Sequence, residues 1–147
     1  MFDKIKGLFR QKDSSQHIFT SKTIGEEFIE KTDGAYLVDG LPTYELAHAK
    51  KHDLDVMQRC CESEMRKMRE ENIVAAPFYF ERVAILARKK KDYRLEVETI
   101  TSYISAVREH YKKNGYPLDA GVMAGPRFSA IAARLTKAKS LLTKENL

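Results

Sequence analysis

The residue types best suited to metal chemistry lie in one short stretch that contains two histidines and two carboxylates. Glu45, His48, His52 and Asp55 follow one another at intervals of three and four residues. On a continuous helix this spacing places their side chains on one face, and two histidines with a carboxylate are typical zinc ligands. The same spacing is typical of a solvated polar face, which is the interpretation we favour. We therefore predict no metal or other cofactor.

Nucleophilic catalysis has little support in the sequence. There is no Gly-x-Ser-x-Gly motif and no Gly-rich phosphate loop followed by Lys and Ser or Thr. The adjacent residues Cys60 and Cys61 are predicted to be buried in a helix, where a reactive thiolate is disfavoured. Without a disulfide framework, a reducing compartment is expected. The sequence thus predicts a cytoplasmic protein that is not an enzyme.

Positive charge is concentrated in the second half of the chain. Residues 1–76 contain twelve Lys and Arg against fourteen Asp and Glu, whereas residues 77–147 contain fourteen against seven, which gives net charges of −2 and +7. A basic surface of this kind gains salt-dependent affinity for phosphates. A small nucleic-acid-binding protein is therefore our alternative function. Its contact residues would be Lys90, Lys91, Lys112, Lys113, Arg127, Arg134 and Lys137.

The spacing of apolar residues predicts an all-α protein of four to five helices. Thr23 and Glu26 fit a capping box that begins a short helix. Gly115 supplies a helix stop, and Pro126 suits a first helical position. The longer helices are expected at residues 43–72, 78–90, 93–113 and from 126 onward. In the first of them the apolar stripe lapses at residues 50–53, which is compatible with a bend or an exposed stretch. The pair at 77–113 should lie at the centre, because its first helix is apolar nearly all round.

The first 40 residues are expected to form a partly ordered segment, followed by a helical domain at residues 41–147. Within residues 1–10, the side chains Phe2, Ile5, Leu8 and Phe9 could share one helical face, as in a short membrane-surface anchor. A helix of about two turns is weak on its own, so membrane contact by residues 1–10 is not expected. The sequence contains no run of 18 apolar residues, so no membrane-spanning helix is predicted.

Two amphipathic segments between Pro77 and His110 resemble one tetratricopeptide repeat, in which two antiparallel helices pack through spaced large and small residues. The matching positions are Phe80, Val83, Ala84 and Ala87 in the first helix and Tyr93, Ile100 and Tyr103 in the second. The resemblance covers about 34 residues. It implies a helical hairpin that serves protein–protein interaction.

Three positions depart from the pattern of that family. Glu96 stands where a small Ala is usual, Lys91 replaces the common turn Gly, and Arg108 replaces a frequent closing Pro. No second copy of the repeat is evident at the same period on either side. Because one repeat cannot bury both of its faces, the flanking helices are expected to cover it.

The resemblance also implies a binding surface for a protein partner or for a second copy of the chain. The groove positions of the family fall on Phe78, Glu81, Ile85, Arg88 and Lys89. Glu81 and Ile85 occupy two sites of the set that clamps peptide carboxylates in some family members, so capture of a C-terminal carboxylate is not predicted. The apolar residues Met65 and Met68 are a further surplus that is compatible with partner binding.

Overall fold

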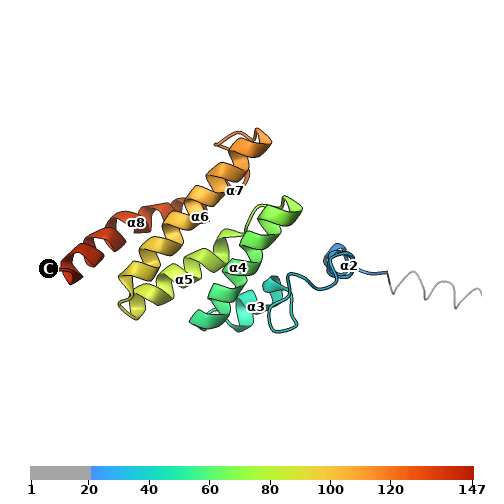
Figure 1. The fold of residues 1–147 in the computed structure, drawn as a ribbon, viewed down its shortest axis with the longest axis horizontal. Coiled ribbons are helices and arrows are strands. Elements are labelled where there is room, and N and C mark those ends of the chain that lie inside the picture. Colours follow the sequence, from blue (N-terminus) through green and yellow to red (C-terminus); the bar gives the residue numbers. More distant parts are fainter. Residues whose placement is uncertain (1–20) are drawn as a thin grey trace, which may run out of the picture. The chain divides into compact units, whose positions relative to one another are not determined.

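In the computed structural model, residues 21–147 are described, and every regular element in this range is a helix (Figure 1). The all-α prediction is confirmed, but the described range contains seven helices rather than four to five. Two features account for the difference. The predicted helix at 43–72 is divided in two, and the predicted loop before Pro126 contains a short helix.

The chain divides into two compact units between Ala35 and Tyr36. In the first unit, helix α2 (Ile24–Lys31) begins at the predicted capping box. The Thr23 hydroxyl accepts a hydrogen bond from the Glu26 backbone N–H at 3.2 Å, and the Glu26 carboxylate accepts one from the Thr23 N–H at 2.9 Å. No side chain of α2 is buried. The membrane-contact prediction for residues 1–10 lies outside the described residues.

The second unit begins with a tight turn at Asp39 and Gly40. Both residues have positive φ angles, 51° and 77°, which Asp and Gly tolerate. Arg59 holds the turn through both oxygens of the Asp39 carboxylate, at 2.5 and 3.0 Å. Ser63 donates a hydrogen bond to the Tyr36 carbonyl at 2.6 Å. The helical unit therefore includes residues 36–40, which the sequence analysis placed in the N-terminal segment.

The predicted helix at 43–72 is two helices, α3 (Thr43–Ala49) and α4 (Leu54–Glu71). The prediction of one continuous helix is wrong because a new helix start lies in its middle. The Asp53 carboxylate accepts a hydrogen bond from the Val56 N–H at 3.1 Å and caps α4. At the other end, Asn72 stops α4 in a left-handed conformation with a φ of 57°.

Helices α5 (Pro77–Lys89) and α6 (Tyr93–Asn114) form the predicted antiparallel hairpin. The rings of Phe80 and Tyr103 stack with centroids 4.2 Å apart. Arg88, later in α5, contacts Glu96, earlier in α6, which fixes the antiparallel direction. The Tyr103 hydroxyl donates to the Ala75 carbonyl at 2.8 Å and so ties the hairpin to the connector before it.

Helix α8 (Pro126–Glu145) follows the short α7 (Gly121–Ala124) and packs on both helices of the hairpin. Its Arg127 contacts Glu81, and the carbonyl of its Arg134 contacts Arg88. In each pair the two residues are 46 positions apart in sequence, so α8 and α5 run in the same direction. Because α5 also packs against α4 and α6, it is the central helix of the unit, as predicted (Figure 1).

Candidate functional site

A buried carboxylate joins three helices of the second unit, close to the turn between α5 and α6. The Glu96 side chain on α6 is fully buried. Its Oε1 accepts a hydrogen bond from Arg88 Nε on α5 at 2.9 Å, and its Oε2 accepts bonds from Arg134 on α8 at 2.9 and 3.1 Å. A buried charge needs such partners because desolvation is costly. This cluster connects helices within the chain. It includes Arg88, predicted to bind a protein partner, and Arg134, predicted to contact nucleic acid.

Three of the five predicted partner-binding residues of α5, Phe78, Glu81 and Arg88, contact residues of α8. Glu81 forms an ion pair with Arg127 at 2.7 Å, and the Arg127 guanidinium lies 5.1 Å from the centre of the Phe78 ring. Arg88 contacts Glu96 and the Arg134 carbonyl. Of the remaining two, Ile85 is half-buried and Lys89 is exposed. Most of this set therefore takes part in contacts within the chain.

The predicted nucleic-acid residues do not form one compact patch. Lys90 and Lys91 lie in the turn before α6, whereas Lys112 and Lys113 lie in its last turn. A helix of 22 residues is about 33 Å long, so the two pairs are at opposite ends. Within α8, Arg127 and Arg134 are already in ion pairs, and Lys137 is exposed.

The four residues with metal-ligand spacing do not share one helical face. Glu45 and His48 belong to α3, and Asp55 belongs to α4 beyond the break. His52, in the break, lies with Nδ1 3.3 Å from Arg82 Nη2, and Asp55 pairs with Arg59 at 3.0 Å. Among the described residues, no group of three or more His, Cys, Asp or Glu is arranged to hold a metal ion.

An open groove of about 530 Å³ runs between α4 and α6, with α5 as its floor. Met65 of α4 and Leu95 of α6 are half-buried on its two sides, and Phe80 and Val83 of α5 lie beneath. The apolar surplus at Met65, noted in the sequence, thus lines a groove. Met68, the other methionine of that pair, is buried in the core.

Charged side chains of both signs surround this apolar floor. Glu62, Arg66 and Arg69 line the α4 side, and Glu98 lines the α6 side. An apolar centre ringed by polar groups is the usual anatomy of a protein interface. We refer to this feature, with its apolar residues Met65, Leu95, Phe80 and Val83, as the α4–α6 groove.

The position of the walls of the α4–α6 groove is fixed at one end by an asparagine pair. Asn72 at the end of α4 and Asn114 at the end of α6 exchange side-chain hydrogen bonds at 2.8 and 3.0 Å. The C-terminal ends of the two helices therefore meet, and α4 and α6 run in the same direction on either side of α5. The two asparagines are 42 residues apart, so no local pattern in the sequence indicates the groove.

The two cysteines lie near the groove but have little nucleophilic character. Cys60 and Cys61 are both free and buried, as predicted, and Cys61 lines the α4–α6 groove. Burial raises the pKa of the Cys60 thiol to about 11, and burial followed by the neighbouring Cys60 raises the pKa of Cys61 further. Near neutral pH both side chains are therefore thiols, which are poor nucleophiles.

No known protein family, curated protein or solved structure matches this chain. In the part of the chain that the structure describes, no helix has the length and apolarity needed to cross a membrane.

Proposed function

We propose that this chain is a non-enzymatic interaction module that binds a protein partner, or a second copy of itself, in the α4–α6 groove. The observation that carries the proposal is the position of Met65 and Leu95 on facing sides of an open groove. Both side chains are only half-buried, so a partner that covers them gains the hydrophobic contribution of their exposed surface. Apolar anchors of this kind dominate the binding energy of interfaces.

The helix order supports the resemblance to tetratricopeptide repeats. An antiparallel pair, α5 and α6, is followed by α8, which packs on both and runs parallel to α5. Helices α3 and α5 begin at Thr43 and Pro77, and the difference of 34 residues equals the period of that family. The α5–α8 register of 46 residues is longer, since α7 and its flanking loop are inserted. Protein interaction is the usual role of such helical arrays.

The shape of the groove favours an amphipathic helix as the bound segment. Its walls are two parallel helices with a third beneath them, which is the setting for helix-in-groove recognition. Apolar residues spaced three or four apart on the partner would contact Met65 and Leu95. Because Arg69 and Glu98 stand on opposite sides, a partner with one charge of each sign beside its apolar stripe would be matched.

Site-specific photo-crosslinking in the native host tests the proposal. A photoreactive amino acid at Met65 is expected to crosslink to one protein, through an amphipathic segment that mass spectrometry locates. The matched control carries the same group at Thr136, which is exposed on α8, and should give no such product. An excess of the synthetic segment should abolish the Met65 crosslink. Crosslinking at Met65 no stronger than at Thr136 would contradict the proposal.

A further inference from the structure

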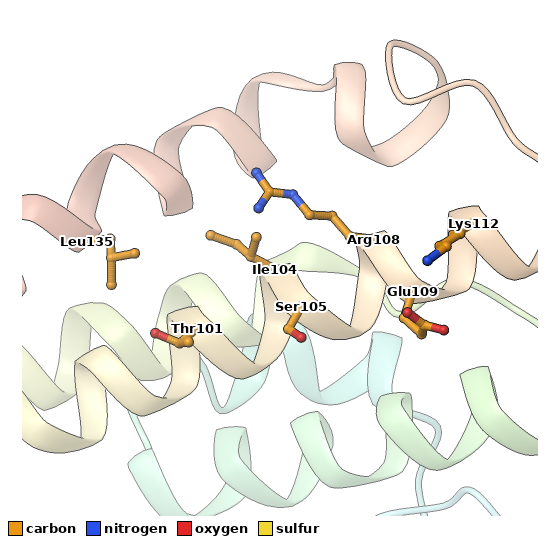
Figure 2. A pocket seen from close by; sticks show the side chains of 7 residues that line it. All are labelled: Thr101, Ile104, Ser105, Arg108, Glu109, Lys112 and Leu135. Atoms are coloured by element: carbon orange, nitrogen blue, oxygen red, sulfur yellow. The ribbon is translucent and has the colours of Figure 1, made fainter.

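A second groove lies between α6 and α8 and is lined by different residues of α6. Its volume is about 370 Å³. Figure 2 shows Ile104 on α6 and Leu135 on α8 at its apolar part, with Thr101 and Ser105 beside them. Ile104 is nearly buried and Leu135 half-buried, so the apolar surface is a shallow floor that a partner could extend.

Two cations stand along α6 at the same groove. Arg108 and Lys112 follow Ile104 at intervals of four residues and therefore lie on the same side of the helix. Neither forms an ion pair with another described residue. Glu109 is the one carboxylate among the described residues that line this groove.

The surrounding charge strengthens this cationic character. Residues 77–147 contain seven carboxylates against fourteen Lys and Arg. Glu81 and Glu96 are already engaged by arginines, and Asp92 caps α6. The carboxylates left to balance Arg108 and Lys112 are therefore few, and an incoming negative charge is favoured.

We propose that the α6–α8 groove is a docking surface for an acidic amphipathic segment of a partner protein. An apolar side chain of that segment contacts Ile104 and Leu135, and carboxylates one to two turns further along contact Arg108 and Lys112. The Thr101 and Ser105 hydroxyls, beside the apolar part, offer hydrogen bonds to the same segment. This surface is separate from the α4–α6 groove, so the inference does not depend on the function proposed above.

The apolar floor favours a peptide over nucleic acid as the occupant. Single-stranded nucleic acid binds through basic grooves with aromatic side chains on which bases stack. No aromatic side chain lines the α6–α8 groove among the described residues. Ile104 and Leu135 suit an aliphatic side chain instead, and the two cations suit carboxylates.

The test uses the whole chain and three fluorescent probes. The first is a short helical peptide with Leu and Glu at helical spacing on an Ala background; the second has Lys for Glu; the third is a single-stranded oligonucleotide. The Glu peptide is expected to bind tightest. In NMR spectra of the isotope-labelled protein, the backbone amide signals that change position on adding this peptide should be those around Ile104, Arg108 and Leu135.

Charge-reversed variants distinguish binding in the groove from attraction to the overall charge of the protein. Arg108→Glu with Lys112→Glu should weaken binding of the Glu peptide by about tenfold or more. The matched control, Arg94→Glu with Lys113→Glu, changes the net charge equally at exposed positions outside the groove and should change affinity by about twofold at most. Equal weakening in both pairs, no binding of the Glu peptide, or tighter binding of the Lys peptide or oligonucleotide would overturn the proposal.

Discussion

Arg134 donates two hydrogen bonds to a single carboxylate oxygen of Glu96, which is fully shielded from solvent. The other oxygen accepts from Arg88, so each oxygen faces a different neighbouring helix. The two arginines are about one-quarter exposed, at 28% and 23% of their side-chain surface. The cluster therefore connects α6 to α5 and to α8 while water still reaches the cationic side.

Replacing Glu96 with Gln should destabilise the fold more than any exposed charge substitution. The change leaves two partly buried guanidiniums without their anion, and breaking a buried pair in this way costs about 3–5 kcal/mol. The free energy of unfolding in urea measures the loss. The matched control is Glu98→Gln, two residues further along α6 and exposed. It should change the free energy of unfolding by about 0.5 kcal/mol or less. Equal effects of the two substitutions would contradict the structural role of the cluster.

Removing the Tyr103 hydroxyl should cost less than removing its ring. In Tyr103→Phe the buried Ala75 carbonyl loses its hydrogen-bond donor, at a cost of about 1–3 kcal/mol. In Tyr103→Ala the stacking on Phe80 is lost as well, and a cavity raises the cost to about 3–5 kcal/mol. Denaturant unfolding monitored by circular dichroism gives both values. A Phe variant as stable as the wild type would show that the bond to Ala75 contributes nothing.

The two cysteines should react slowly with thiol reagents while the protein is folded. Burial raises the pKa of Cys60 to about 11 and that of Cys61 further. The reactive thiolate form of both residues is therefore scarce at about pH 7–8. We expect slow release of chromophore from a disulfide reagent in buffer and fast reaction of both thiols in denaturant. Single Cys60→Ala and Cys61→Ala variants assign each phase. A fast reaction of the folded protein that disappears when one cysteine is replaced would contradict the burial of that cysteine.

Stability should decrease as His110 becomes protonated. Burial, with a smaller effect from Lys113, lowers the pKa of His110 below its usual 6.5. Because the folded state binds the proton less tightly than the unfolded chain, this stability is present above pH 6.5 and is lost as the pH falls through the lowered pKa. The melting temperature should therefore fall between about pH 7 and pH 5, and fall less in His110→Gln. The same pH dependence in both proteins would rule out this contribution.

Much of the fold could be predicted because its helix ends are encoded locally. The capping box at Thr23, the proline at Pro77 and the glycine at Gly115 each mark a helix end within a few residues. The lapse of the apolar stripe at residues 50–53 indicated a bend or an exposed stretch, but the start of a new helix there was missed. The single carboxylate of Asp53 that starts the new helix resembles any other polar residue on an exposed face.

The functional surfaces were harder to predict because they depend on contacts between distant segments. Glu96 was noted only as a departure from a small residue in the repeat pattern. Its partner Arg134 is 38 residues away, and that arginine was assigned to nucleic-acid contact. The α4–α6 groove likewise requires knowing that Asn72 and Asn114 meet. Local spacing identified Met65 as surplus apolar surface but could not place Leu95 opposite it.

The most direct test of partner binding in the α4–α6 groove is calorimetric titration of the crosslinked partner segment into three proteins. They are the wild type, Met65→Glu, and Thr136→Glu, which adds the same charge on the exposed face of α8. A charge among the apolar anchors should weaken binding by about tenfold to a hundredfold, whereas the Thr136 variant should bind like the wild type. Unchanged affinity in a folded Met65→Glu protein would contradict binding in this groove.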